Sequence, residues 1–293
     1  MIRRGHVNKK VSLFDIFNYT LMIVLSLVFL IPFWIILVSS LSDNSKLMSN
    51  GIGLWFQGFT FDGYKYLFEM SNLFFNSLLN SVIVSFASSI ISVVLCTSAA
   101  YVLSRKGLVG RKFFNILFMI PMFFGGGTIA LFLVIKWINL YNTLWALILP
   151  CTLRIASILL MRNFFYTIPD SLSEAAEIDG ANEFQKMVKV YIPLAIPMMM
   201  TIGLIIFVDR WNNWLDTLLY FDSTKETSWT IQYVLRQILT NMNSISGIDE
   251  SSLAPVIAAR NAAIVITVIP LMILSPMLHK YYVKGMTAGS VKQ

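Results

Sequence analysis

Arg154 is the residue whose position most directly suggests chemistry, because it lies about midway along an apolar segment, residues 143–165. A charge at the centre of a membrane-spanning helix costs about 2.5–3.5 kcal/mol on insertion scales. The planar guanidinium group could face a polar cavity and bind sugar hydroxyls or a carboxylate. Alternatively, it could be a buried partner for Asp209, Asp216 or a second subunit. Of the two interpretations, we favour the cavity.

A Trp-Asn-Asn-Trp run at residues 211–214 could bind a carbohydrate. Aromatic faces stack on the C–H surfaces of sugars, and amides hydrogen-bond to sugar hydroxyls. Tryptophan is also enriched where spans meet the membrane surface, which explains the run equally well. The candidate ligand-binding residues here are Trp211, Asn212 and Trp214.

Four further charges fall near the outer ends of apolar segments: Asp209, Arg210, Asp216 and Arg260. Side chains at such positions can extend toward the membrane surface, which lowers the cost of their charge. We therefore expect them to reach the interface.

The sequence contains no catalytic constellation. Its two histidines, His6 and His279, are far apart, and neither a zinc-protease motif nor a Gly-x-Ser-x-Gly motif is present. It also lacks the Gly-x-x-x-x-Gly-Lys-Ser/Thr loop that cradles nucleotide phosphates. We expect no enzyme activity, metal or cofactor in this chain, and any ATP must be bound by another polypeptide.

The composition indicates an all-α integral membrane protein, since 57% of the residues are hydrophobic and only 13% are charged. A helix needs about 20 apolar residues to cross the hydrocarbon layer. Six segments meet this length: 13–39, 75–103, 112–137, 143–165, 192–219 and 256–279. The serines and small residues of the second segment predict a face for close helix packing.

The distribution of basic residues predicts the orientation. Arg105, Lys106, Arg111 and Lys112 crowd the short link between the second and third segments, and alternate loops carry few positive charges. By the positive-inside rule, both termini and this link are cytoplasmic. The net charge of +7 therefore requires no nucleic-acid partner, because the basic residues lie at membrane ends.

Gly125, Gly126 and Gly127 interrupt the third segment shortly after Pro121. Each glycine costs roughly 1 kcal/mol relative to alanine in a helix. The three glycines predict a bend that either lines a translocation path or subunit interface, or is a simple kink. We leave these two interpretations open.

A polar helical hairpin, residues 169–190, lies between two apolar segments. Ser171 and Glu174 have the spacing of a capping box at its first helix, and Gly180 predicts the turn. The second helix, residues 181–190, would present apolar side chains on one side: Phe184, Met187 and Val188.

The hairpin resembles the EAA loop of binding-protein-dependent ABC importer permeases. The resemblance rests on Glu174-Ala175-Ala176, on Gly180 after three intervening residues, and on Val190-Tyr191-Ile192-Pro193, which departs conservatively from Ile-x-Leu-Pro. Further landmarks are Phe124–Gly127, Asn142–Pro150, Met161–Phe165, the Trp-Asn-Asn-Trp run and Lys280–Gly285. Together they are most similar to the maltose-permease-like carbohydrate group, in its branch for complex oligosaccharides. Arg154 departs from that pattern, in which a neutral residue is usual.

The resemblance implies a type I ABC importer permease fold in a bacterial plasma membrane. It implies a heterodimer with a second homologous permease, a cytoplasmic ATPase dimer and an extracytoplasmic solute-binding protein that delivers sugar. Import would proceed by alternating access. The ATPase-coupling residues would be Glu174, Ala175, Ala176, Asp179 and Gly180, with Phe184 and Met187 as apolar anchors.

Three other classes are weighed against this interpretation. An ion-coupled secondary transporter would need an ion site, for which only Asp209 and Asp216 are candidates. A membrane enzyme would need catalytic residues that this sequence lacks, and a scaffold would have little use for a glycine-broken span.

The predicted domains are an N-terminal part with the first span and an external segment, residues 1–74. A five-helix core with the hairpin, 75–283, and a cytoplasmic tail, 284–293, follow.

Overall fold

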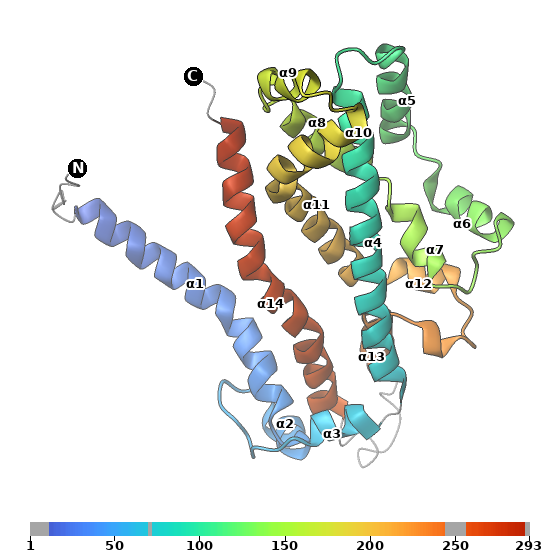
Figure 1. Cartoon of the computed structure of the whole chain (residues 1–293). Helices are drawn as coiled ribbons and strands as arrows, with labels where there is room; N and C mark the ends of the chain where they lie inside the picture. The colour runs from blue at the N-terminus through green and yellow to red at the C-terminus, as the bar shows by residue number, and fades with distance from the viewer. Residues whose placement is uncertain (1–11, 70–71, 244–255, 291–293) are drawn as a thin grey trace. The chain divides into compact units, whose positions relative to one another are not determined.

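The computed structural model in Figure 1 describes residues 12–69, 72–243 and 256–290. Within these ranges the regular elements are helices, and one isolated β-type bridge joins Ser42 to Phe59. The predicted all-α fold is confirmed. The chain forms two compact units: unit 1 comprises residues 1–69 and 246–265, and unit 2 comprises 70–245 and 266–293.

Four continuous helical stretches are long and apolar enough to cross a membrane: Leu13–Ser40, Leu73–Ser104, Glu183–Asn212 and Ile257–Leu274. These stretches correspond to all or part of the helices α1 (Leu13–Ser40), α4 (Asn72–Ser104), α11 (Ile192–Asn212) and α14 (Val256–Ser290). Among the described residues, the predicted number of six is reached only if each of two bent helix pairs forms one span.

The first bent pair is α5 (Arg111–Phe123) and α6 (Gly127–Trp137), which meet at 111°. The second joins the short α7 (Trp145–Ile148) and η1 (Leu149–Cys151) to α8 (Ile155–Phe165) at 44°. In the first pair, Gly127 has a φ of +75°, which a residue with a side chain rarely adopts. The glycines therefore end one helix and start another, so the bend expected from the sequence is present and is a sharp one.

Helix α4 is the axis of unit 2, and it packs along α8 and α11. Its serines Ser85, Ser88 and Ser92 are fully buried, which confirms the predicted packing face. On α11, a Cβ atom added to Gly203 would lie 3.2 Å from Cγ2 of Val93 on α4. Small residues thus let the two backbones approach closely, as is usual for helices packed in lipid.

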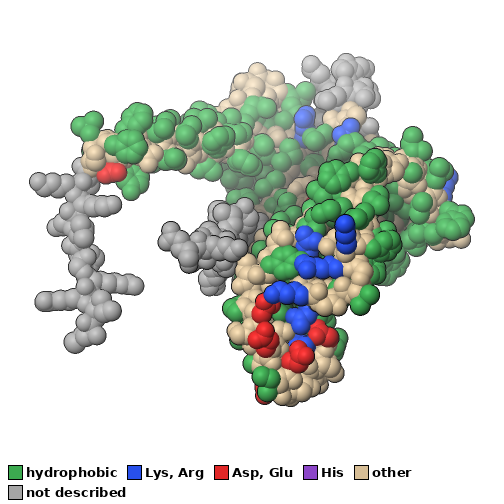
Figure 2. Space-filling model, turned by 90° about the horizontal axis from the view of Figure 1, so that it is seen from above, with side chains coloured by type: hydrophobic (Ala, Val, Ile, Leu, Met, Phe, Trp, Pro, Cys, Tyr) green, Lys and Arg blue, Asp and Glu red, His purple; other side chains and the backbone are tan. Residues whose placement is uncertain are grey.

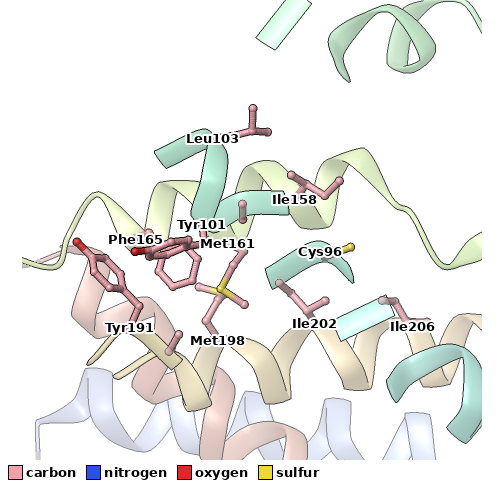
Figure 3. Close-up of a cluster of buried hydrophobic side chains, with 12 residues drawn as sticks. Cys96, Tyr101, Leu103, Ile158, Met161, Phe165, Tyr191, Met198, Ile202 and Ile206 are labelled. Atoms are coloured by element: carbon pink, nitrogen blue, oxygen red, sulfur yellow. The ribbon is translucent and has the colours of Figure 1, made fainter. Parts of the chain in front are cut away.

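A buried cluster joins α4, α8 and α11 near one end of unit 2, as Figure 3 shows. Tyr101, Phe165 and Tyr191 meet edge to face, with ring centroids 5.1–6.2 Å apart. This arrangement adds to the stabilisation that burial alone gives. Cys96, Ile158, Met161 and Ile202 continue the cluster along the helices.

Beyond α11, unit 2 contains α12 (Leu215–Tyr220), η3 (Glu226–Ser228) and α13 (Ile231–Asn243). The Tyr141 hydroxyl and the Asn142 side-chain amide both donate to Asp222 at 2.6 Å, and these bonds lower the pKa of its carboxyl group. The polar run at 247–250 lies outside the described residues.

Unit 1 contains α1, α2 (Asn44–Asn50), α3 (Asp62–Glu69) and the first part of α14. Its aromatic side chains form an edge-to-face series from Trp34 through Phe56, Phe59 and Phe61 toward Tyr64. Asn44 Oδ1 accepts hydrogen bonds from the backbone N–H groups of Ile257 and Ala258, which ties α2 to the start of α14.

Candidate functional site

The predicted hairpin is present at one end of unit 2 (Figure 1). It consists of α9 (Asp170–Ile178), a turn, α10 (Glu183–Lys186) and the π-helical turn η2 (Met187–Tyr191), which leads into α11. Gly180 has a φ of +78°, so the turn assigned to it from the sequence is confirmed.

The predicted capping box at the first helix is wrong. Pro169 is extended and α9 already begins at Asp170, so Ser171 lies inside the first turn and cannot cap it. A capping box instead starts α10. Asn182 Oδ1 accepts from the backbone N–H of Gln185 at 2.9 Å, and Gln185 Oε1 accepts from that of Asn182 at 3.0 Å.

The acidic helix of the hairpin faces outward. Glu174, Ala175, Asp179 and Gly180 are exposed, whereas Ala176 is half-buried. Two large apolar side chains stand out on the same hairpin, with exposed fractions of 87% for Ile178 and 69% for Phe184. Isolated exposed apolar residues are ordinary, but two on one short polar hairpin suggest an interaction surface.

Phe184 and Met187 do not share one exposed side. Met187 is half-buried and packs against the cluster of Figure 3, because the π-helical turn that starts at this residue changes the side-chain register. The sequence did not indicate Ile178, although its position next to Asp179 at the end of the acidic helix could have suggested it.

Arg105, just after α4, connects three parts of the hairpin region. Its Nη1 donates to the Tyr191 hydroxyl at 2.9 Å, and its Nη2 donates to Ser173 Oγ at 3.0 Å. Its Nε lies 3.2 Å from Glu183 Oε2. One rigid guanidinium fork therefore holds α9, α10 and η2 to the end of α4.

Glu183 is the second centre of this network. Its carboxylate accepts from the Tyr101 hydroxyl at 2.7 Å and lies 2.6 Å from Nζ of Lys186. Lys186 is only 3% exposed and also pairs with Glu177 at 3.1 Å. Buried charges are retained when they are paired in this way.

Charged side chains surround the hairpin, and Figure 2 shows basic side chains in a row with acidic ones beside them. Lys106 Nζ lies 2.6 Å from Asp170 Oδ2; the hydrogen bond lowers the pKa of the Asp170 carboxyl and raises that of Lys106. A cavity of about 720 Å³ opens between the α4–α5 link and the hairpin; Arg105, Glu174 and Glu183 are among its lining residues.

Unit 2 has a second polar cavity, of about 530 Å³, between the start of α8 and the end of α11. Arg154 and Asp209 line it together with the polar and aromatic residues Asn212, Asn213 and Trp214. Arg154, Asn212 and Trp214 were predicted as ligand-path residues, and the structure brings these three together.

Trp211, the fourth such prediction from this region, does not line the cavity. Its side chain is fully buried, stacks on Phe207 with the rings inclined by 13°, and donates through Nε1 to the Thr267 carbonyl at 3.2 Å. It packs α11 against α14, so the assignment of Trp211 to a ligand path is not supported by its position.

The charged residues at this cavity form a chain of ion pairs. Asp209 Oδ2 lies 3.3 Å from Arg154 Nη1 and 3.0 Å from Arg210 Nη2, and Arg210 Nη1 lies 2.8 Å from Asp216 Oδ2. Arg210 is only 7% exposed, so the expectation that it extends toward the membrane surface is wrong. Two carboxylates compensate its burial instead.

Arg154 lies at a helix break, not in the middle of a helix. It precedes α8 with extended backbone angles, so both interpretations offered for it apply: it lines the cavity and pairs with Asp209. Its Nη1 is buried and makes no aligned hydrogen bond with any residue that the structure describes.

The ring of Trp214, which lines this cavity, is in contact with a further cation that is not itself among the lining residues. The guanidinium carbon of Arg236, on α13, lies 3.6 Å from the centroid of the Trp214 ring. Gly125, Gly126 and Gly127 line neither polar cavity, and an added Cβ at Gly125 or Gly127 would meet nothing within 4 Å.

Comparison with known proteins gives concordant matches over most of the chain. Residues 99–288 match the family described as "Binding-protein-dependent transport system inner membrane component". The polygalacturonan/rhamnogalacturonan transport system permease protein YtcP of Bacillus subtilis (strain 168) is 34% identical, over 97% of this chain and 99% of the relative. The arabinooligosaccharides transport system permease protein AraQ of Halalkalibacterium halodurans is 28% identical, over 89% and 90% of the two chains.

A solved structure has the same fold. It is the crystal structure of a bacterial ABC transporter involved in the import of the acidic polysaccharide alginate. The match has a TM-score of 0.82 and 26% sequence identity, and it covers 95% of this chain and 99% of the other.

Proposed function

The chain belongs to the family of binding-protein-dependent transport system inner membrane components, and we propose that it couples oligosaccharide import to a separate ATPase through the α9–α10 hairpin. It is a permease of a carbohydrate-importing ABC transporter and a multi-pass protein of the bacterial membrane.

The observation that carries the coupling proposal is the outward-facing hairpin held firmly to α4. Ile178 and Phe184 are exposed for contact with an ATPase subunit, and Glu174 and Asp179 offer charges beside them. Arg105 and Glu183 connect the hairpin to α4, the helix that packs along α8 and α11. Movement of the hairpin would therefore be transmitted to the helices around the second polar cavity.

This connection supports the proposal that transport proceeds by alternating access. ATP binding would close the ATPase pair, displace the hairpin and open the cavity toward the solute-binding protein. Hydrolysis would reset the inward-facing state. The partners are a second homologous permease, a cytoplasmic ATPase dimer and an extracytoplasmic solute-binding protein, with both termini of this chain and the hairpin on the cytoplasmic side.

The substrate is proposed to be an oligosaccharide. YtcP carries polygalacturonan or rhamnogalacturonan by its name, AraQ arabinooligosaccharides, and the structural relative takes part in alginate import. The Trp214 ring and the side-chain amide of Asn212 supply stacking and hydrogen bonds suited to sugar rings and hydroxyls at the cavity.

The alternative of ion-coupled transport receives no support from the two candidate carboxylates. Asp209 and Asp216 are both paired with Arg210, so neither is free to bind a cation.

Oligosaccharide uptake by proteoliposomes containing the complete complex tests whether ATP drives this permease. We expect uptake to require ATP at the cytoplasmic face and to be insensitive to ionophores. Uptake that needs an ion gradient and no ATP would contradict the proposal.

Gly180→Pro and Glu174→Lys test the hairpin itself. Proline cannot adopt the positive φ of Gly180, and lysine reverses a charge on the exposed helix. We expect both variants to abolish uptake while their amount in the membrane stays normal, as measured by immunoblotting. Lys225→Ala, an exposed change far from the hairpin in sequence, is the control. Normal uptake by both hairpin variants would remove the coupling claim.

A further inference from the structure

We propose that Arg154 is a specificity-determining residue that binds a carboxylate of an acidic oligosaccharide, and that Asp209 forms an ion pair with Arg154 when no sugar is bound. This inference rests on the proposed function, which supplies the oligosaccharide, and adds the charge of that sugar. It assigns the substrate class from the charges at the second polar cavity.

The first observation is that Arg154 is incompletely engaged. Its contact with Asp209 is an ion pair at 3.3 Å without hydrogen-bond alignment, so Nη1 is buried and unsatisfied. A buried donor without a partner is costly, so the ion pair with Asp209 leaves the guanidinium group incompletely satisfied. The guanidinium side chain is 37% exposed and lines the cavity, so a ligand can reach it.

The second observation is that Asp209 does not need Arg154. The same oxygen, Oδ2, accepts hydrogen bonds from Arg210 Nη2 at 3.0 Å and Nε at 3.3 Å. Arg210 is buried, and its remaining Nη1 is held by Asp216 at 2.8 Å. A carboxylate of the sugar could therefore replace Asp209 as the partner of Arg154, while Asp209 stays paired with Arg210.

The third observation is the balance of charge. Arginines outnumber aspartates among the side chains that form the ion-pair chain or cover Trp214: Arg154, Arg210 and Arg236 against Asp209 and Asp216. One added carboxylate would equalise them. A guanidinium fork binds carboxylates through two parallel hydrogen bonds, an arrangement that a single neutral hydroxyl does not offer.

The test compares two sugars that differ only in charge, an oligogalacturonate and its fully methyl-esterified form, in proteoliposomes containing the complete complex. We expect Arg154→Gln to lower uptake of the acid by about tenfold, the effect of losing a charged hydrogen bond, and to lower uptake of the ester much less. Lys136→Gln is the control, because Lys136 lies over the rings of Phe132 and Tyr141, outside the cavity.

The charge-balanced double variant Arg154→Gln with Asp209→Asn separates recognition from structure. If Arg154 binds the sugar, the double variant still fails to import the acid. If Arg154 only neutralises Asp209, the double variant recovers import of both sugars, and the inference is overturned. Equal loss of both sugars in Arg154→Gln, or no loss of either, overturns it as well.

The wild-type results distinguish this inference from the proposed function. ATP-dependent import of the ester but not of the acid leaves the proposed function standing and overturns the role of Arg154. Absence of ATP-dependent import of either sugar contradicts the proposed oligosaccharide import and, with it, the inference.

Discussion

Arg105 illustrates how a single side chain can join a surface hairpin to the membrane-spanning helices. It contacts Ser173, Glu183 and Tyr191, which lie 68 to 86 residues further along the chain. No spacing rule in a sequence connects residues so far apart. Gly180, in contrast, was predicted because the turn it makes is set by local backbone conformation. The turn at Gly180 could therefore be predicted from the sequence, and the partners of Arg105 could not.

Arg105→Lys tests the connection at this scale. Lysine keeps the charge but lacks the planar fork, so it cannot hold Ser173, Glu183 and Tyr191 together. We expect sugar uptake per ATP hydrolysed to fall several-fold, measured with both activities on the same proteoliposomes. Arg111→Lys is the matched control, because Arg111 donates to the hydroxyl of Tyr166, which follows α8 and lies outside the hairpin. Unchanged stoichiometry in Arg105→Lys would exclude a role in coupling.

Lys186 offers a second test at the residue scale. Its ammonium group is nearly buried between Glu183 and Glu177. We expect Glu183→Gln to lower the unfolding temperature of unit 2, since the ammonium group of Lys186 loses one of its two charged partners. Thermal unfolding in detergent measures this. Gln185→Glu, an exposed change in the same short helix, should differ little from the wild type; equal stability of the Glu183→Gln variant would refute the burial argument.

At the scale of elements, the sequence predicted which segments are apolar helices but not how they bend. The apolar segments of the sequence predicted where α1, α4, α11 and α14 lie, because a helix that crosses the membrane requires a long run of hydrophobic residues. The glycines predicted a break after α5, yet the angle of 111° depends on tertiary packing. Trp211 was misassigned for a similar reason. The position of Trp211 along α11 directs its side chain toward α14. The Trp-Asn-Asn-Trp pattern alone does not indicate this direction.

Gly203→Val tests the close approach of α4 and α11. Its Cβ would lie 3.2 Å from Val93 Cγ2, and the branched methyl groups would need more space still. We expect a loss of about 1–3 kcal/mol, typical of overpacking, seen as a lower unfolding temperature in detergent. Gly107→Ala is the control, since its Cβ would meet nothing within 4 Å. A Gly203→Val variant as stable as the control would show that the helices separate freely.

At the scale of the whole molecule, the distribution of charge predicts which side of the membrane each part faces. Arg105, Lys106 and Arg111 gather with the acidic hairpin at one end of unit 2, in agreement with their assignment to a common side. The sequence predicted this grouping because the positive-inside rule depends on composition at span ends. The division into two compact units differs from the predicted domains, since residues 246–265 join unit 1. Such pairing of distant segments has no sequence signature.

Accessibility labelling tests the orientation. In a cysteine-free background, a membrane-impermeant maleimide should label Lys225→Cys in intact cells and label Ala175→Cys only after the cells are opened. Both positions are exposed in the structure, so access to the reagent decides the result. Labelling of Ala175→Cys from outside would reverse the proposed orientation.

Docking of the hairpin on the ATPase is the central claim, and site-specific crosslinking tests it most directly. A photo-reactive residue at Ile178 or Phe184, the two most exposed large apolar positions of the hairpin, is activated in membranes containing the assembled transporter. The account predicts a covalent adduct with the ATP-binding subunit from both positions and none from Lys225. Absence of that adduct from both positions, while the ATPase still co-purifies with the chain, would contradict the account.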